Sequence, residues 1–253
     1  MMSKIISIHS YRRGSGKTST AVNLGVLMAL QGMRVAVVDA NLQSPSLHIL
    51  LGLDERHISY RLNDYLAGRI DILTAAFDAT ALLGITGEGE FFAVPASPEP
   101  RDIAYLLRHG YDLDLLHAGM RALAETLKLE VLIIDNPAGL LEDNLSLIAI
   151  ADKTLIVMRY DSREFQGTSV LVGVARKLDG ANVTLLVNEM PAGISAQEVI
   201  PLMSEKFACP VIGVIPHLDE MFISDEKRLF VLREPSHPVT KTLKEAANQL
   251  IRT

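Results

Sequence analysis

The chain has 253 residues, of which 49% are hydrophobic and only 5% aromatic, and this aliphatic content excludes intrinsic disorder. Thirty acidic and 24 basic residues give a formal net charge of −6, which argues against an overall basic surface for nucleic acid. The single cysteine, Cys209, excludes a disulfide scaffold, a cysteine-based zinc site and a cysteine-ligated iron–sulfur cluster.

Short β-branched runs alternate with longer segments of helical periodicity along the chain. Several of the runs are apolar throughout, which is typical of parallel strands covered on both faces. The predicted strands are Ile5–Ile8, Arg34–Val38, Phe91–Val94, Val131–Ile134, Thr154–Met158, Val183–Val187 and Val211–Ile215. The predicted helices include Ser19–Gln31, Asp112–Leu127, Gln166–Leu178 and Ala196–Phe207. This alternation predicts an α/β fold, with a doubly wound, mainly parallel sheet, helices on both faces and ligands at the carboxyl ends of the strands.

Two regions depart from this alternation. Residues 54–90 are less regular, and we interpret them as a helical excursion with a surface loop, so that residues 1–253 form one domain. In the last segment, Val239, Leu243, Ala246 and Leu250 form one helical stripe. An amphipathic membrane anchor needs a strong basic face and larger apolar residues, so the sequence favours a terminal helix docked on the sheet.

The N-terminus and the hydropathy pattern predict the compartment. The N-terminal segment MMSKIISIHS is too short and too polar for a signal peptide. No apolar run approaches the ~18 residues of a membrane-spanning helix. We therefore expect a soluble, cytoplasmic protein.

The loop after the first strand has the context that a P-loop requires, since a strand precedes it and a helix follows it. Backbone N–H groups at such a helix N-terminus bind phosphate oxygens. Lys17 suits the β- and γ-phosphates, and the Thr18 hydroxyl suits Mg²⁺. The predicted nucleotide-binding residues here are Arg13, Gly14, Ser15, Gly16, Lys17, Thr18 and Ser19.

The loop lacks the first glycine of the ordinary G-x-x-x-x-G-K-[ST] motif, because Tyr11 stands at that position. It resembles instead the deviant Walker A box of the ParA/MinD family, a K-G-G-x-G-K-T-type loop. In that family the signature lysine reaches across a dimer interface to the ATP of the partner. Arg12 holds this position here, either in that catalytic role or as a solvated arginine at the rim, and Arg13 replaces a conformationally permissive glycine.

Two later strand ends resemble the switch segments of the same family. Asp39 matches the first acid of switch I, which lies near Mg²⁺, whereas the second, catalytic acid is replaced by Asn41. An amide can orient the attacking water but cannot accept its proton as a carboxylate would. Asp135 ends an apolar strand in the Walker B pattern, where the acid holds Mg²⁺, and the following D-x-P-A-G resembles switch II.

The resemblance extends to the base and to the branch of the family. Asn188 matches the asparagine that contacts adenine, and Pro216 lies in a segment similar to the G-x-I-P-x-D stretch beside the base. The segments Q-S-P-S-L-H and V-P-A-S resemble sequences of the MinD branch of the family. His9 is expected to be packed or at the surface, with no catalytic role.

The resemblance implies an ATP-dependent dimerising ATPase that uses ATP/ADP and Mg²⁺ and positions cellular cargo or a division or motility machine. It also implies a homodimer and an activating partner or cargo protein. Asn41 leaves open a very slow or non-hydrolysing nucleotide sensor, and a small-molecule ligase on the same fold is a third alternative.

The surface that would support such a switch is not identified by the sequence. Non-specific DNA binding needs a local basic patch, for which the candidates are Arg159, Arg163, Arg228 and Arg233. A solvated strand end is the favoured interpretation of the first two.

Overall fold

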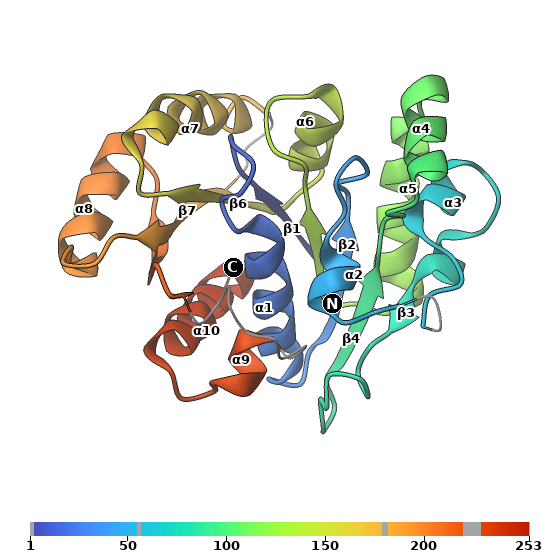
Figure 1. Ribbon diagram of the computed structural model, residues 1–253, viewed down its shortest axis with the longest axis horizontal. Helices are drawn as coiled ribbons and strands as arrows, with labels where there is room; N and C mark the ends of the chain where they lie inside the picture. The colour runs from blue at the N-terminus through green and yellow to red at the C-terminus, as the bar shows by residue number, and fades with distance from the viewer. Residues whose placement is uncertain (1–2, 55–56, 179–181, 220–228, 253) are drawn as a thin grey trace.

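The computed structural model describes residues 3–54, 57–178, 182–219 and 229–252. The described residues form one eight-stranded sheet with the strand order β3-β4-β2-β5-β1-β6-β7-β8 (Figure 1). All neighbouring strands pair in parallel except β3 and β4, which are antiparallel. The strands are β1 Lys4–His9, β2 Arg34–Asp39, β3 Phe77–Asp78, β4 Glu90–Val94, β5 Val131–Asp135, β6 Lys153–Arg159, β7 Asn182–Met190 and β8 Val211–Pro216.

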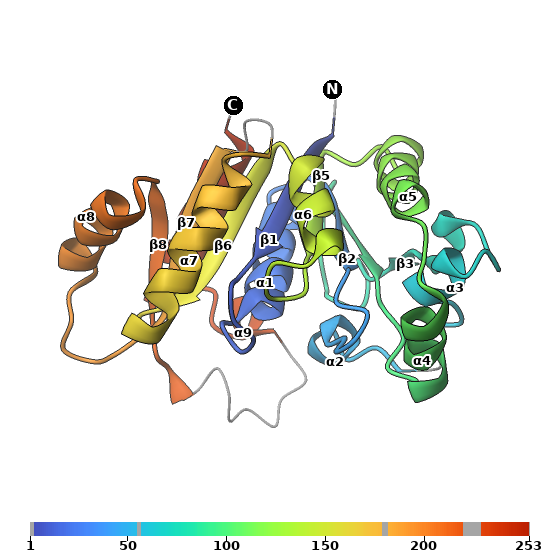
Figure 2. The ribbon, with the colours of Figure 1, turned by 90° about the horizontal axis from the view of Figure 1, so that it is seen from above.

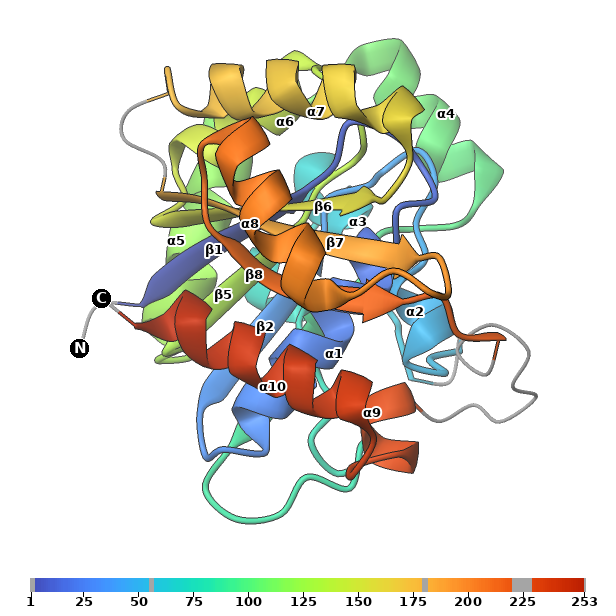
Figure 3. The same cartoon turned by 90° about the vertical axis from the view of Figure 1, so that its left-hand side faces the viewer.

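Helices cover both faces of this sheet, as the apolar strands predict. The helices are α1 Lys17–Ala29, α2 Leu47–Leu50, α3 Leu62–Leu66, α4 Pro100–His109, α5 Leu113–Thr126, α6 Glu142–Ala149, α7 Ser162–Ala175, α8 Ala196–Phe207, α9 Phe230–Arg233 and α10 Pro238–Ile251, with a 3₁₀ turn, η1, at Ile72–Ala75. Helices α1 and α10 lie on one side of the strands, and α6 and α7 lie on the other (Figure 3).

Alternation along each central strand explains this layering, because successive side chains point to opposite faces. Val131 and Ile133 of β5 pack in the cluster that includes α1 and α10, whereas Leu132 and Ile134 pack with α5. The sheet is therefore buried on both sides, and its carboxyl edge is left for the loops. The start of β1 and the end of α10 lie at the opposite edge, where Lys4 Nζ donates to the Ile251 carbonyl at 2.9 Å (Figure 2).

The seven predicted strands are confirmed, and so are the four predicted helices, with shifted ends. The strand that the sequence missed is β3, which has only two residues and therefore no periodicity to detect. Helix α7 begins at Ser162, before the predicted Gln166, because the Asp161 side chain accepts the Arg163 N–H and caps the helix. Helix α1 begins at Lys17, directly after Gly16.

The predicted docking of the terminal helix is also confirmed. Its stripe of Val239, Leu243, Ala246 and Leu250 is buried, and α10 packs on α1 and β8. Within the described ranges, no helix has the length and apolarity that a membrane crossing requires.

Candidate nucleotide-binding site

Two glycines shape the loop between β1 and α1. Gly14 and Gly16 have φ angles of 76° and 88°, a left-handed conformation that favours glycine. A Cβ atom on Gly16 would also lie 2.2 Å from Asn188 Nδ2, and this same amide donates to the Ser15 carbonyl at 2.9 Å. Asn188, at the end of β7, therefore holds the second half of the loop in place, a contact that the expected role in base recognition did not include.

Arg12 and Arg13 are exposed and occupy ordinary backbone conformations. Among the described residues, a positive φ outside glycine occurs only at Lys128, Glu189 and Ala208. The backbone at residue 13 does not adopt the left-handed region, so an arginine at this position causes no conformational strain. Arginine is tolerated where the conformation does not demand glycine.

A pocket of about 340 Å³, called here the phosphate pocket, lies over this loop. It brings together predicted residues from the P-loop and from the loop after β2. Its lining residues are Arg13, Gly14, Gly16, Lys17, Thr18, Ser19, Asn41, Ser44, Ser46, Ile49, Leu50 and Ala138. Arg12, Asn188 and Pro216 do not line it, although Asn188 lies near the end of β7 and Pro216 ends the neighbouring β8.

Lys17 is buried beneath the phosphate pocket, with 8% of its surface exposed. Burial lowers the pKa of the Lys17 ammonium, and the charge of Asp135 is the strongest opposing influence. A cation held at low exposure, at the start of a helix, is suited to contact with phosphate oxygens.

Asp39 and Asp135 lie side by side, because β2 and β5 pair with these two residues in register. Asp39 accepts three backbone N–H groups, from Asn41 at 3.1 Å, Ser46 at 3.0 Å and Leu47 at 3.1 Å. Both carboxylate oxygens of Asp135 are buried and have no hydrogen-bond partner. The structure thus places two carboxylates behind the P-loop, one engaged with backbone and one not.

Burial raises the pKa of both carboxyl groups. For Asp39 the three backbone N–H groups counteract this effect. For Asp135 the charge of Asp39 raises the pKa further, while the nearby Thr18 hydroxyl and Lys17 ammonium lower it. A buried carboxylate without donors is costly unless a cation compensates it.

The loop after β2, residues 40–46, closes over the Thr18 hydroxyl. The Ser46 hydroxyl donates to Thr18 Oγ1 at 3.2 Å, and Asn41 Nδ2 donates to the Ser44 carbonyl at 2.6 Å. Ser46 was missed by sequence reasoning, because a serine in a loop has no pattern that distinguishes it from an ordinary turn residue. The Asn41 amide braces its own loop.

The loop after β5 is tied to the end of β1. Gly139 donates its N–H to the Ser10 carbonyl at 3.1 Å, and Asn136 Nδ2 donates to Ser7 Oγ at 2.7 Å. His9 is fully buried between them, and its Nδ1 accepts the Ser10 N–H at 2.8 Å. Burial, reinforced by the charge of Lys17, lowers the pKa of His9 to about 3. Of the two places that the sequence left open for His9, packed or at the surface, the structure shows the packed one.

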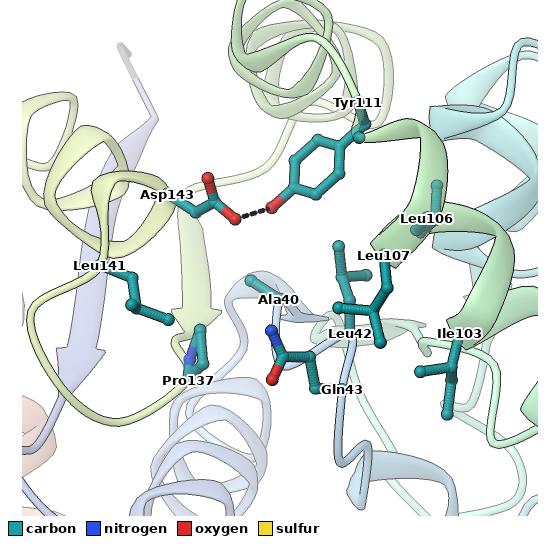
Figure 4. A pocket seen from close by; sticks show the side chains of 11 residues that line it. Ala40, Leu42, Gln43, Ile103, Leu106, Leu107, Tyr111, Pro137, Leu141 and Asp143 are labelled. Atoms are coloured by element: carbon teal, nitrogen blue, oxygen red, sulfur yellow. Dashed lines mark hydrogen bonds between the residues drawn. The ribbon is translucent and has the colours of Figure 1, made fainter.

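A second pocket, of about 220 Å³, separates the loops after β2 and β5 from α4 (Figure 4). Ala40 and Leu42 line it from one loop, and Pro137 and Leu141 line it from the other. At one end Tyr111 Oη donates to Asp143 Oδ2 at 2.6 Å. The loops that follow Asp39 and Asp135 therefore both border this pocket, whose lining combines apolar side chains with polar atoms.

Two of the four arginines that were candidates for a basic patch are engaged in ion pairs, and a third, Arg233, lies over the ring of Phe230. Arg159 Nε contacts the buried Glu164 at 2.7 Å, and Arg163 contacts Asp161 at 2.7 Å. Arg228 lies outside the described residues. The favoured interpretation of a strand end, with local pairs, agrees with these contacts.

Comparison with known proteins matches residues 6–230 to the CobQ/CobB/MinD/ParA nucleotide binding domain. The chain belongs to this family. It is 28% identical over 259 residues to an uncharacterized ATP-binding protein of Methanocaldococcus jannaschii, covering 99% of this chain and 89% of that protein. It is 28% identical over 232 residues to the septum site-determining protein MinD of Synechocystis sp., covering 89% and 80% of the two chains.

Among solved structures, MinD of Pyrococcus horikoshii complexed with Mg-ADP has a TM-score of 0.80 at 23% identity, covering 98% of this chain and 96% of that one. The predicted fold class and the predicted ParA/MinD membership are confirmed, and MinD proteins are among the relatives. The family as a whole includes MinD- and ParA-type ATPases.

Proposed function

We propose that this chain is a slow, Mg²⁺-dependent ATPase that dimerises when it binds ATP and positions cellular cargo or a division or motility machine. The observation that supports it best is that Lys17, which lines the phosphate pocket, is largely buried and lies within the field of the buried Asp135 carboxylate, whose oxygens accept no hydrogen bond. Both groups are incomplete in the protein alone, and the phosphate and cation of a metal–nucleotide complex would satisfy them.

The residues fit Mg²⁺ better than a metal bound by protein groups alone. Across the described ranges, three or more His, Cys, Asp or Glu side chains do not gather around one point. Mg²⁺ keeps several waters and uses one or two carboxylates together with substrate phosphates. Thr18, Asp39 and Asp135 would hold it, directly or through water, and Mg²⁺ supplies neutralisation of phosphate charge when bound.

Asn41 supports slow turnover. Its Nδ2 is committed to the Ser44 carbonyl, which leaves Oδ1 to orient a water molecule. An amide oxygen cannot take the proton of that water, so the same observation favours a second candidate, a nucleotide sensor without hydrolysis.

Dimerisation would use the exposed edge that contains Arg12. This side chain lies outside the phosphate pocket and is exposed, as a residue that contacts nucleotide on a partner subunit must be. The activating partner or cargo stays unidentified, and DNA or a membrane surface would be revealed by sedimentation with ATP.

Two measurements test the proposal. Light scattering at micromolar protein should show self-association that requires both ATP and Mg²⁺. Steady-state phosphate release should be slow for the wild type, faster for Asn41→Asp and absent for Lys17→Ala. Association without turnover in both the wild type and Asn41→Asp would favour the sensor, and no response of association to ATP would refute the switch.

A further inference from the structure

The ring of Tyr11 lies directly on the backbone of α7. A Cβ atom built on Gly167 would stand 2.0 Å from Tyr11 Cδ1 and 2.2 Å from Cε1, distances that no real side chain tolerates. Tyr11 is 36% exposed, so the residue remains partly accessible while its ring contacts the helix at Gly167. A residue with any side chain at position 167 would displace the aromatic ring from its present place.

The two glycines of α7 differ in this respect. Glycine inside a helix costs about 0.5–1 kcal/mol relative to alanine, so each position lowers the intrinsic stability of the helix. A Cβ on Gly173 would meet nothing within 4 Å, whereas one on Gly167 would meet the Tyr11 ring. Gly167 is therefore matched to Tyr11, and Gly173 offers a control within the same helix.

The part of α7 beneath Tyr11 is firmly attached to the sheet. Glu164, one turn before Gly167, is 1% exposed, accepts the Arg159 N–H at 3.1 Å and pairs with the Arg159 guanidinium at 2.7 Å. The charge of Glu164 also acts on Lys17, whose pKa it raises. This first turn of α7 is thus a fixed support next to the phosphate loop.

The phosphate loop is the segment between β1 and α1, residues 10–16. Its second half, residues 14–16, is held by the hydrogen bond from Asn188 to the Ser15 carbonyl. In its first half, Ser10 Oγ donates to the Arg12 carbonyl at 2.6 Å, which is a bond within the loop itself. The contact of Tyr11 with Gly167 is what joins this first half to a neighbouring helix.

We infer that Tyr11 is a positioning residue, which seats the first half of the phosphate loop on α7 and so makes this helix part of the nucleotide site. The inference rests on the proposed nucleotide-binding function and adds a means of regulation, because a shift of α7 changes the loop through Tyr11. Tyr11 stands where the ordinary motif has glycine, so its ring replaces freedom of the loop with a packed contact.

Titration with a fluorescent ATP analogue and Mg²⁺ tests this coupling. Gly167→Ala should weaken binding about tenfold or more, as overpacking does, and Gly173→Ala should leave binding unchanged. Tyr11→Phe, which keeps the ring, should bind as the wild type does. Tyr11→Gly should bind several-fold more weakly, and adding Gly167→Ala to it should have no further effect, because the clash is gone.

The outcomes separate the inference from the proposed function. A wild type that does not bind the analogue refutes the nucleotide function. Binding by the wild type, with an equal penalty for Gly167→Ala whether or not Tyr11 is present, or with unchanged affinity in Tyr11→Gly, overturns the role of Tyr11 and leaves the proposed function standing. If Gly167→Ala fails to fold, recovery of folding in the double variant supports the contact, and no recovery contradicts it.

Discussion

Asp39 and Asp135 end two neighbouring parallel strands and lie opposite each other in register, yet their surroundings differ. Asp39 accepts three backbone N–H groups from the loop that follows it, whereas neither oxygen of Asp135 has a partner. Two aspartates at equivalent strand ends therefore have different roles. Asp39 shapes a loop in the protein alone, and Asp135 is left with the capacity to compensate a bound cation.

The comparison teaches that adjacency on a strand edge does not make two carboxylates equivalent. Burial raises the pKa of both, but only Asp39 receives donors that oppose the shift through the backbone. Variants that neutralise one carboxylate at a time can separate the structural contribution from the proposed contribution to binding.

The largest effect is expected for Asp135→Asn on nucleotide binding. Loss of this carboxylate should weaken the Mg²⁺-dependent affinity for a fluorescent ATP analogue by about 10–100-fold. Chelation of Mg²⁺ by EDTA should lower the affinity of the wild type and leave that of the variant nearly unchanged. A variant that responds to EDTA as the wild type does would show that Asp135 does not act through the cation.

For stability without nucleotide, the larger effect is expected for Asp39 and the smaller one for Asp135. Asp39→Asn replaces charged acceptors of three N–H groups and should lower the free energy of unfolding by about 2–3 kcal/mol. Asp135→Asn removes a buried carboxylate that accepts no backbone N–H, and the relief of desolvation offsets the lost attraction to Lys17, so the free energy of unfolding should change by less than about 1 kcal/mol. Urea unfolding of both variants measures the difference, and equal losses would contradict the comparison.

A third test uses pH, because burial shifts the pKa values of His9 and Asp135 in opposite directions. His9 has a pKa lowered from 6.5 to about 3, so the unfolded chain binds more protons and stability falls as pH drops through this window. The pKa of Asp135 is raised from 3.8 to about 7, so between these two values the folded chain binds more protons, and stability rises as the pH drops from the folded-state pKa to the unfolded one. His9→Gln should flatten the acid-side loss by at most about 1.4 kcal/mol per pH unit, and Asp135→Asn should steepen it. Urea unfolding at several pH values measures how the free energy of unfolding changes with pH in each variant. A pH dependence equal to that of the wild type in both variants would contradict the shifted pKa values of the two groups.

The smallest effect concerns the hydroxyl pair over the site. Ser46→Ala removes the donor to Thr18 Oγ1 and should weaken Mg-ATP binding about threefold. Ser44→Ala is the matched control, because Ser44 contacts Asn41 through its carbonyl rather than its side chain. A loss that is equal in the two variants would indicate a general effect on the loop.

Much of the fold and the outline of the candidate site could be predicted, because both depend on local patterns. Apolar runs such as Val131–Ile134 identify buried strands, and Gly16-Lys17-Thr18 after a strand indicates a phosphate loop. The short strand Phe77–Asp78 and the start of α7 at Ser162 could not be predicted as well, because they depend on one pairing partner and one capping side chain. At position 13 the sequence shows that an arginine stands where the resembling motif has glycine, and only the backbone conformation shows that this exchange causes no strain.

The sequence by itself determined the α/β class, the family and the chemistry of the loop, because periodicity and short motifs are properties of neighbouring residues. Only the tertiary structure decided which groups complete one another. The Asn188 amide donates to the Ser15 carbonyl, and Gly167 leaves room for the ring of Tyr11. Three N–H groups of the loop after β2 donate to Asp39, and none of them donates to Asp135. These outcomes depend on how strand ends and helices are packed in space, and spacing along the chain does not specify such contacts.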